Sequence, residues 1–215
     1  MFQKLVFSFL LCCHAFMLSG QVVPVYYSSW KRLKHKRTTP FYDLVQIHQR
    51  SNHEIRVYGG NDFEILASQD NISPKTIRNK VLAIQKGDSL FLNGEKIKLA
   101  PYYCKVIQKG TYIVFKGSVT DKEQSHIDEL VAIYGASGGF EARLLAEFNE
   151  KRNLYYLDTR KSKPKVVRID RLEIRRLLRG HKELYKKYEK ELEMDSMDTM
   201  IRYMEIINQM QNKPE

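Results

Sequence analysis

The sequence predicts an α+β fold in which an antiparallel β meander, built as a small sandwich or a partly open barrel, precedes a helical C-terminal region. Two observations lead to this prediction. Residues 54–118 show short alternations of apolar and polar residues separated by Gly and Asn turns, which is typical of consecutive strands. After residue 170, apolar residues recur at helical spacing instead. Strands followed by helices, without regular alternation, favour an α+β arrangement.

The first 20 residues have the pattern of a secretory signal peptide. Lys4 precedes an apolar stretch at 5–18, and the small residues Ser19 and Gly20 close it. The stretch is too short to span a bilayer with margin, and a buried N-terminal helix is the alternative. We therefore expect export to the periplasm, the outer envelope or the extracellular space. The mature chain, from about Gln21, is expected to contain no transmembrane helix.

Residues 21–50 are predicted to be a basic N-terminal segment. A short strand at 22–27 would lead into a linker, and residues 41–48 would form a strand or a single helical turn. The linker contains the run KRLKHKR at 31–37, which has five cations and no acidic residue. A run of like charges this close to the mature N-terminus favours a disordered arm.

Residues 51–169 are predicted to form a β-rich domain. Ile55 and Val57 alternate with polar neighbours and predict its first strand. Further strands are predicted at 63–65, 80–85, 89–92, 95–99, 103–108, 111–116, 154–157 and 166–169. Asn93-Gly94 is expected to form a tight hairpin turn, because both central positions of such a turn need positive φ. A helical segment at 121–149 is predicted as an insertion into this domain.

Residues 170–215 are predicted to form three C-terminal helices. Asp170 is a candidate N-cap of the first helix, because its carboxylate can accept a hydrogen bond from a first-turn N–H. The third helix carries Met197, Met200 and Met204 at helical spacing. We expect this methionine row to be a pliant packing seam and not a ligand site.

No metal site or cofactor is predicted. Cys104 is the one cysteine that remains after the signal peptide, so an internal disulfide is not possible. Its strand-like surroundings favour a buried, unreactive thiol. The histidines of the mature chain lack the i, i+4 spacing of helical zinc sites.

Positive charge is concentrated between residues 160 and 190. The formal net charge of the chain is +11, and this stretch holds thirteen Lys or Arg against four acidic residues. Such clustering favours an acidic partner, namely an acidic protein, a polysaccharide or an anionic lipid surface, although basic side chains can also simply solvate helix faces. Nucleic acid is not expected as the partner of an exported protein without a visible recognition module. The predicted contacts are Arg171, Arg175, Arg176, Arg179, Lys182, Lys186 and Lys187.

A different interpretation starts from the motif Gly135-Ala136-Ser137-Gly138-Gly139, which matches the G-x-S-x-G nucleophile elbow. Asp158 and His181 follow Ser137 in the order of an α/β-hydrolase triad. The consecutive hairpins upstream disfavour this interpretation, because a nucleophile elbow belongs to a parallel sheet with crossover helices. A small serine hydrolase using Ser137, His181 and Asp158 is therefore the alternative hypothesis.

Several stretches of the chain resemble a family of secreted proteins of unknown function from Bacteroides-type bacteria. They are the signal that ends directly before Gln21, RNKVLAIQKGDSLFLNG (78–94), KGTYIVFKG (109–117), the glycine pair at 138–139, NLYYLDTRKSKPKVVRI (153–169) and RLLRGHKELYKKYEKELE (176–193). The resemblance covers most of the mature chain. It implies export and an uncharacterised role, and it supplies no catalytic residues.

The sequence thus predicts a secreted or periplasmic protein that binds an acidic partner or acts as an envelope-associated accessory, without enzyme activity. A structural envelope component that assembles through the last helix is a further alternative.

Overall fold

The computed structural model describes residues 22–41, 45–67, 74–118 and 152–211. Its strands are β1 (Val25–Tyr27), β2 (Thr39–Pro40), β3 (Val45–Gln49), β4 (Phe63–Ala67), β5 (Ala83–Lys86), β6 (Ser89–Asn93), β7 (Tyr103–Gln108), β8 (Tyr112–Gly117), β9 (Asn153–Asp158) and β10 (Val166–Arg168). Its helices are α2 (Trp30–Lys34), α3 (Asn52–Tyr58), α4 (Pro74–Lys80), the 3-10 helix η2 (Glu95–Ile97), α7 (Arg171–Leu178), α8 (Lys182–Tyr188) and α9 (Met197–Gln211).

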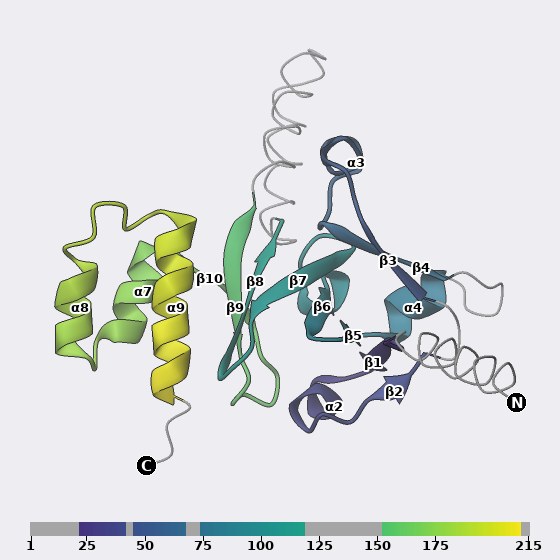
Figure 1. Ribbon diagram of the computed structural model, residues 1–215, viewed down its shortest axis with the longest axis horizontal. Helices are drawn as coiled ribbons and strands as arrows, with labels where there is room; N and C mark the ends of the chain where they lie inside the picture. The colour runs from purple at the N-terminus through teal and green to yellow at the C-terminus, as the bar shows by residue number, and fades with distance from the viewer. Residues whose placement is uncertain (1–21, 42–44, 68–73, 119–151, 212–215) are drawn as a thin grey trace, which may run out of the picture.

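The described strands form one open antiparallel sheet, and the three C-terminal helices lie beside one end of it (Figure 1). The sheet order is β10-β9-β8-β7-β6-β5-β1-β2, and the β3–β4 hairpin joins it through β7. From β5 to β10, each strand pairs with its neighbour in the sequence. The predicted fold class, an antiparallel meander followed by a helical C-terminal region, is confirmed.

Both faces of the sheet are apolar, because the strands bury alternate side chains on opposite sides. In β8, Ile113 and Phe115 belong to one core cluster, whereas Tyr112 and Val114 belong to another. Side chains on alternate positions of a strand point to opposite faces, which is why one strand serves two cores.

The inner face holds a cluster to which six strands contribute. It includes Tyr27 of β1, Leu90 of β6, Cys104 of β7, Ile113 of β8 and Tyr155 of β9. Strands this far apart in the sheet order share one core only if the sheet curls toward this face. The inner face therefore resembles the inside of a partly open barrel.

The outer face is covered at its two ends by different elements. Helices α7 and α9 cover β8 and β9, and Ile174, Leu178 and Met204 are buried there. Helix α8 packs against α7 and α9 on the side away from the sheet (Figure 1). The predicted methionine row packs within the chain here, since Met197 and Met200 are half-buried against the same cluster. At the other end of the sheet, α4 and the β3–β4 hairpin cover the outer face, and their cluster consists of Phe41, Val45, Ile65, Ile77, Val81, Ile84, Phe91 and Tyr103.

The strand predicted around Ile55 and Val57 is wrong, because these residues lie in helix α3. Ser51 and Glu54 form a capping box at its start, in which each side chain bonds the backbone N–H of the other residue. Arg50, which is buried, donates to the carbonyl oxygens of Glu54 and Gly59. These polar contacts outweigh the apolar–polar alternation of a short segment.

The hairpin predicted at Asn93-Gly94 is also wrong, and so is the strand predicted at 95–99. Gly94 has φ −57°, and the chain continues into the 3-10 helix η2. Glycine is required here for space: a Cβ at Gly94 would lie 2.2 Å from the carbonyl oxygen of Ala100. The buried Asn93 amide donates to the carbonyl oxygens of Arg78 and Val81, so it fastens α4 to the sheet.

The N-terminal segment is more ordered than predicted. Residues 31–37, expected to be a linker or disordered arm, contain most of α2, whose N-cap Ser29 accepts a hydrogen bond from the N–H of Arg32. The strand predicted at 22–27 is observed as β1. Of the segment 41–48, predicted as a strand or a single helical turn, residues 45–48 lie in strand β3. The helical insertion predicted at 121–149 lies outside the described residues. Within the described part of the chain, no helix has the length and apolarity needed to cross a bilayer.

Candidate functional site

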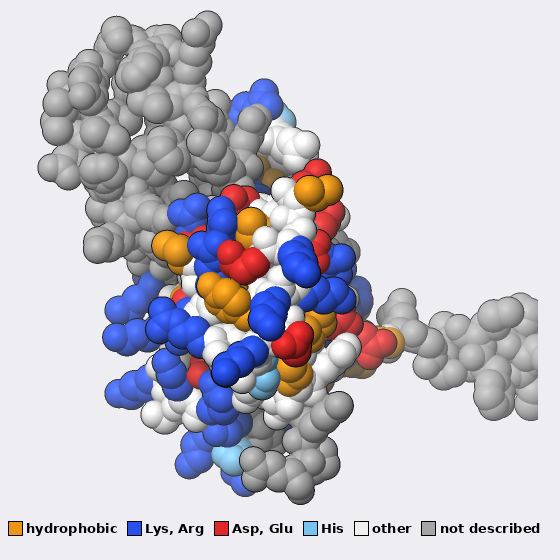
Figure 2. Space-filling model, turned by 90° about the vertical axis from the view of Figure 1, so that its left-hand side faces the viewer, with side chains coloured by type: hydrophobic (Ala, Val, Ile, Leu, Met, Phe, Trp, Pro, Cys, Tyr) orange, Lys and Arg blue, Asp and Glu red, His pale blue; other side chains and the backbone are white. Residues whose placement is uncertain are grey.

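Helices α7 and α8 border a shallow cleft of about 810 Å³ that opens to solvent. Six of its lining residues are Lys or Arg, and two are acidic. Figure 2 shows this end of the molecule, where basic side chains gather with a few acidic and apolar ones among them. The lining residues are Arg168, Asp170, Leu172, Glu173, Arg175, Arg176, Arg179, Lys182, Tyr185 and Lys186.

The local sequence explains why the cations face outward. Asp170 caps α7 by accepting a hydrogen bond from the N–H of Glu173, as predicted. Ile174 and Leu178, one turn apart, are fully buried and fix which side of α7 faces the core. The basic residues between and after them therefore lie toward solvent, and α8 begins directly after the turn at Gly180.

One cation of the cleft is held by a carboxylate of α8. Arg175 donates two hydrogen bonds to Glu189, at 2.6 and 2.7 Å. This bidentate pair keeps the pKa of Glu189 below its ordinary value, because the guanidinium favours the ionised carboxylate. Arg175 thus joins α7 to α8, and its charge is largely compensated.

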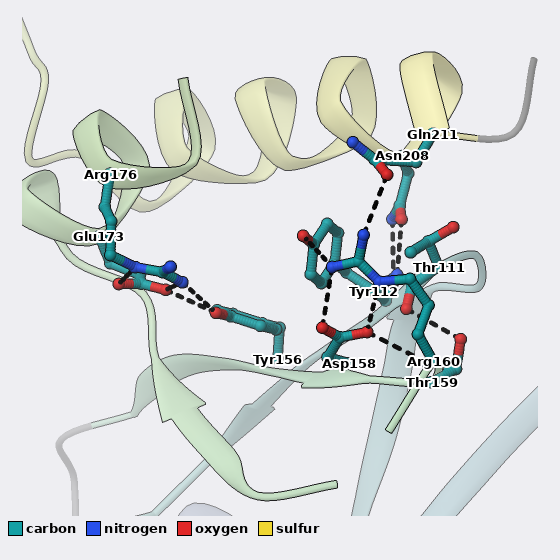
Figure 3. A network of polar contacts seen from close by, with 10 residues as sticks. All are labelled: Thr111, Tyr112, Tyr156, Asp158, Thr159, Arg160, Glu173, Arg176, Asn208 and Gln211. Atoms are coloured by element: carbon teal, nitrogen blue, oxygen red, sulfur yellow. Dashed lines mark hydrogen bonds and ion pairs between the residues drawn. The ribbon is translucent and has the colours of Figure 1, made fainter. Parts of the chain in front are cut away.

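A second cation is held by α7 itself and by the sheet (Figure 3). Arg176 donates to both oxygens of Glu173, at 2.6 and 2.7 Å, and its Nη2 donates to the hydroxyl of Tyr156 at 2.9 Å. The Tyr156 hydroxyl in turn donates to Glu173. Burial alone would raise the pKa of Glu173, but the hydrogen bonds from Arg176 and Tyr156 hold it below its ordinary value. This triad attaches α7 to β9.

Three further cations of the cleft lie on α8 or in the turn before it. Arg179, Lys182 and Lys186 are exposed, and Arg179 and Lys182 have no carboxylate partner among the described residues. Lys186 lies 3.4 Å from Glu183, but both side chains are more than two-thirds exposed. Such an exposed pair contributes little and is easily exchanged for another anion.

Five of the seven predicted contacts meet at this cleft, namely Arg175, Arg176, Arg179, Lys182 and Lys186. The other two, Arg171 and Lys187, do not line it; Arg171 is half-buried, and Lys187 is exposed elsewhere on α8.

Sequence reasoning missed five lining residues, two of which are the helix cap Asp170 and its partner Glu173. Arg168 ends β10, and its place two residues before the Asp170 cap could have indicated it. Leu172, which is 71 % exposed, and Tyr185 also line the cleft.

Of the alternative hydrolase site, two residues are described. Asp158 receives hydrogen bonds from Arg160 on both carboxylate oxygens, at 2.9 and 2.8 Å, and these bonds hold its pKa below the ordinary value. Arg160 also contacts the Tyr112 hydroxyl and Gln211, which links β9 to β8 and α9 (Figure 3). His181 is exposed at the start of α8. Ser137 lies outside the described residues.

Chemistry that needs a metal or a reactive thiol finds no support in the described part of the chain. It contains no group of three His, Cys, Asp or Glu side chains placed to hold a metal ion. Cys104 is free and buried in the inner cluster, and burial raises its pKa well above the ordinary value. The described cleft can hold anionic groups through charge-assisted hydrogen bonds.

Comparison with known proteins adds the family alone. No curated protein and no solved structure gave a significant match. One family model matches residues 25–211, which span the sheet, the basic cleft and the C-terminal helices. The chain therefore belongs to a protein family of unknown function, DUF6563.

Proposed function

We propose that this protein is a non-enzymatic binding protein whose α7–α8 cleft docks on an acidic protein partner. The observation that carries the proposal is that some cations of the cleft are paired with carboxylates of the same chain and others are exposed. Arg175 and Arg176 are fixed by internal carboxylates and keep the two helices in place. Arg179 and Lys182 are exposed and have no carboxylate partner within the described part of the chain, so we take their charge to be available to an incoming carboxylate.

The apolar residues in the cleft favour a protein over a polysaccharide or a lipid surface. Leu172 and Tyr185 give the cationic surface an apolar contact, and the arginines beside them belong to the residue types enriched at protein interfaces. A sulfated or carboxylated polymer would need the spaced cations but not Leu172. An exposed leucine among cations fits a partner segment that carries both acidic and apolar side chains.

The proposal includes export. Lys4, the apolar stretch at 5–18 and the small residues that follow support a signal peptide, and a compartment outside the cytoplasm excludes most nucleic acid as a partner. A mass-spectrometric N-terminus of the secreted protein near Gln21 is the expected result in a host that exports it. An intact N-terminus on protein recovered from the cytoplasm would contradict this part.

A charge-reversal experiment tests the cleft. The probe is a fluorescent peptide of alternating Glu and Leu, and binding is followed by anisotropy at several salt concentrations. Reversing the free cations in the double variant Arg179→Glu/Lys182→Glu should weaken binding by at least about tenfold, because two charge-assisted contacts become repulsive. Affinity of the wild-type protein should fall steeply with salt.

The matched control is Lys163→Glu/Lys165→Glu, which changes the net charge equally at exposed residues outside the cleft. The control should bind the peptide within about twofold of wild type. An equal loss in both variants would show that only net charge matters and would overturn the proposal. Tighter binding to a sulfated polysaccharide or to anionic vesicles than to the peptide would reject the protein partner.

A further inference from the structure

A second cleft, of about 970 Å³, lies at the mouth of the curled sheet. Helix α2 forms one wall, and the turn between β9 and β10 forms the other; Figure 1 shows these two segments next to each other below the sheet. The mouth of a curled or closed sheet is a common place for small-molecule sites, and this volume is in the range such sites occupy. The cleft is separate from the basic cleft of α7 and α8, since the two share no lining residue.

The floor of this cleft is continuous with the apolar inner core. Tyr27, Leu90 and Ile113 are buried members of the inner cluster and also line the cleft. Trp30 and Leu33 of α2 are half-buried and pack against the same cluster. An aromatic and aliphatic floor of this kind accepts an apolar body of similar size.

The rim is cationic. Lys31, Lys34 and Lys36 come from α2 and the residues just after it, Lys109 from the turn between β7 and β8, and Lys161 from the turn after β9. Two basic segments that are far apart in the sequence thus meet around one opening. Among the described residues that line this cleft, none is Asp or Glu.

The rim is held in place by specific contacts. Arg32 donates to the Thr39 hydroxyl at 2.7 Å, which ties α2 to β2. The Lys109 ammonium donates to the backbone carbonyl of Asp88 and is thereby fixed beside the opening. Lys36 has φ +52°, a left-handed conformation that costs a non-glycine residue free energy and that ends α2. An apolar cavity with cations around its opening is complementary to a molecule with an apolar body and an anionic head.

We propose that the cleft between α2 and the β9–β10 turn binds a small amphipathic anion. The apolar body lies on Tyr27, Trp30 and Leu33, and the anionic head faces the lysines of the rim. This inference does not depend on the α7–α8 site, and each can fail alone.

Trp30 makes the proposal directly measurable, because the chain contains a single tryptophan. Decanoate, used below its critical micelle concentration, is the probe, and decanol is its uncharged counterpart. Decanoate should change the emission of Trp30 in a saturable titration, with a dissociation constant that rises with salt. Decanol should bind at least about tenfold more weakly, because it cannot form charge-assisted contacts with the rim.

Two paired variants locate the anionic head. Lys34→Gln/Lys161→Gln removes one cation from each wall and should weaken decanoate binding by about tenfold or more. Lys163→Gln/Lys165→Gln removes two exposed cations outside the cleft and should leave the affinity unchanged. Because all four side chains are exposed, neither variant threatens folding.

Three results would overturn the proposal: unchanged Trp30 emission, equal affinity for decanol, or an equal loss in both variants. Displacement of decanoate by the Glu–Leu peptide would instead assign this cleft to an acidic polymer and reject a small ligand. The variant Arg179→Glu/Lys182→Glu should bind decanoate normally, which separates this result from the outcome at the α7–α8 cleft.

Discussion

Asn61 shows how a single buried amide can organise three segments of this chain. Its Nδ2 donates to the carbonyl oxygens of Ala100 and Pro101, and its Oδ1 accepts from the N–H and hydroxyl of Ser118. The residue is 1 % exposed, so none of these groups can turn to water instead. The loop before β4, the turn before β7 and the end of β8 therefore depend on one side chain.

We expect Asn61→Ala to lower the free energy of unfolding by about 3 kcal/mol, because it leaves buried donors and acceptors without partners. Urea denaturation followed by circular dichroism measures the change. Asn52→Ala, at an exposed position of α3, is the matched control and should change stability by less than about 0.5 kcal/mol. A loss for Asn61→Ala no larger than that of the control would contradict the role assigned to this amide.

Helix α9 is joined to β8 by a comparable contact. Asn208 accepts from the N–H of Tyr112 at 2.8 Å and donates to the carbonyl oxygen of the same residue at 2.9 Å. The approach is close enough that a Cβ at Gly110 would lie 2.8 Å from the Asn208 side chain. Helix α9 thus contacts β8 through the amide of Asn208, and the absence of a side chain at Gly110 leaves room for this amide.

This geometry predicts strong coupling between the two positions. Gly110→Ala and Asn208→Ala should each destabilise the protein by about 2 kcal/mol, the first through a clash and the second through unpaired backbone groups. The double variant should be less destabilised than the sum, because Asn208→Ala removes the atoms that the new methyl group would strike. Four urea denaturation curves complete the cycle, and strict additivity would argue against the contact.

Elements with strong local signals could be predicted from the sequence. Strands β7, β8 and β9 have long apolar runs bounded by turn residues, and α7 has both a capping aspartate and an apolar face. Helix α3 had a readable signal, the capping-box spacing of Ser51 and Glu54, but the apolar–polar alternation of Ile55 and Val57 obscured it. The 3-10 helix η2 could not be predicted, because it is only three residues long. Short segments take the structure that their tertiary contacts favour.

The same limit applied to the candidate site. Clustering of charge was enough to name five of the residues that line the α7–α8 cleft, because an amphipathic helix turns its cations outward. The sequence did not reveal which of them are compensated. Arg175 finds Glu189 only after α7 and α8 have packed together, and Tyr156 reaches Arg176 only from the sheet. The cleft beneath α2 was missed for a related reason, since its lysines come from segments that only the fold brings together.

At the scale of the whole molecule, carboxylates that are paired in the folded state make the free energy of unfolding depend on pH. Asp158 and Glu173 join the sheet to α9 and α7, and the pKa of each lies below its ordinary value in the folded protein. In the unfolded chain these carboxyl groups have ordinary pKa values of about 4, so the unfolded chain takes up protons first as the pH falls. Stability from these groups is fully present above that pH and is lost as the pH falls through the lower, folded-state values.

We therefore expect Asp158→Asn and Glu173→Gln to cost on the order of 1 kcal/mol each at pH 7 and much less near pH 3. The measurement is the free energy of unfolding at several pH values between these limits. The wild-type and variant curves should converge in acid. Glu183→Gln, at a side chain that is 89 % exposed, serves as the control and should stay parallel to wild type. A constant offset for the two variants would exclude the linkage.

Strand β1 meets its partner late along the chain, since Tyr26 pairs with Ile84 of β5. The strands from β5 to β8 instead pair with their sequence neighbours, so their hairpins close short loops and can form early in folding. Until β1 docks, the edge of β5 is unpaired and is exposed to pairing with another copy of the chain. A small molecule seated on Trp30 would hold the last-closing part of the sheet shut, and in that way would protect the newly made protein from self-association.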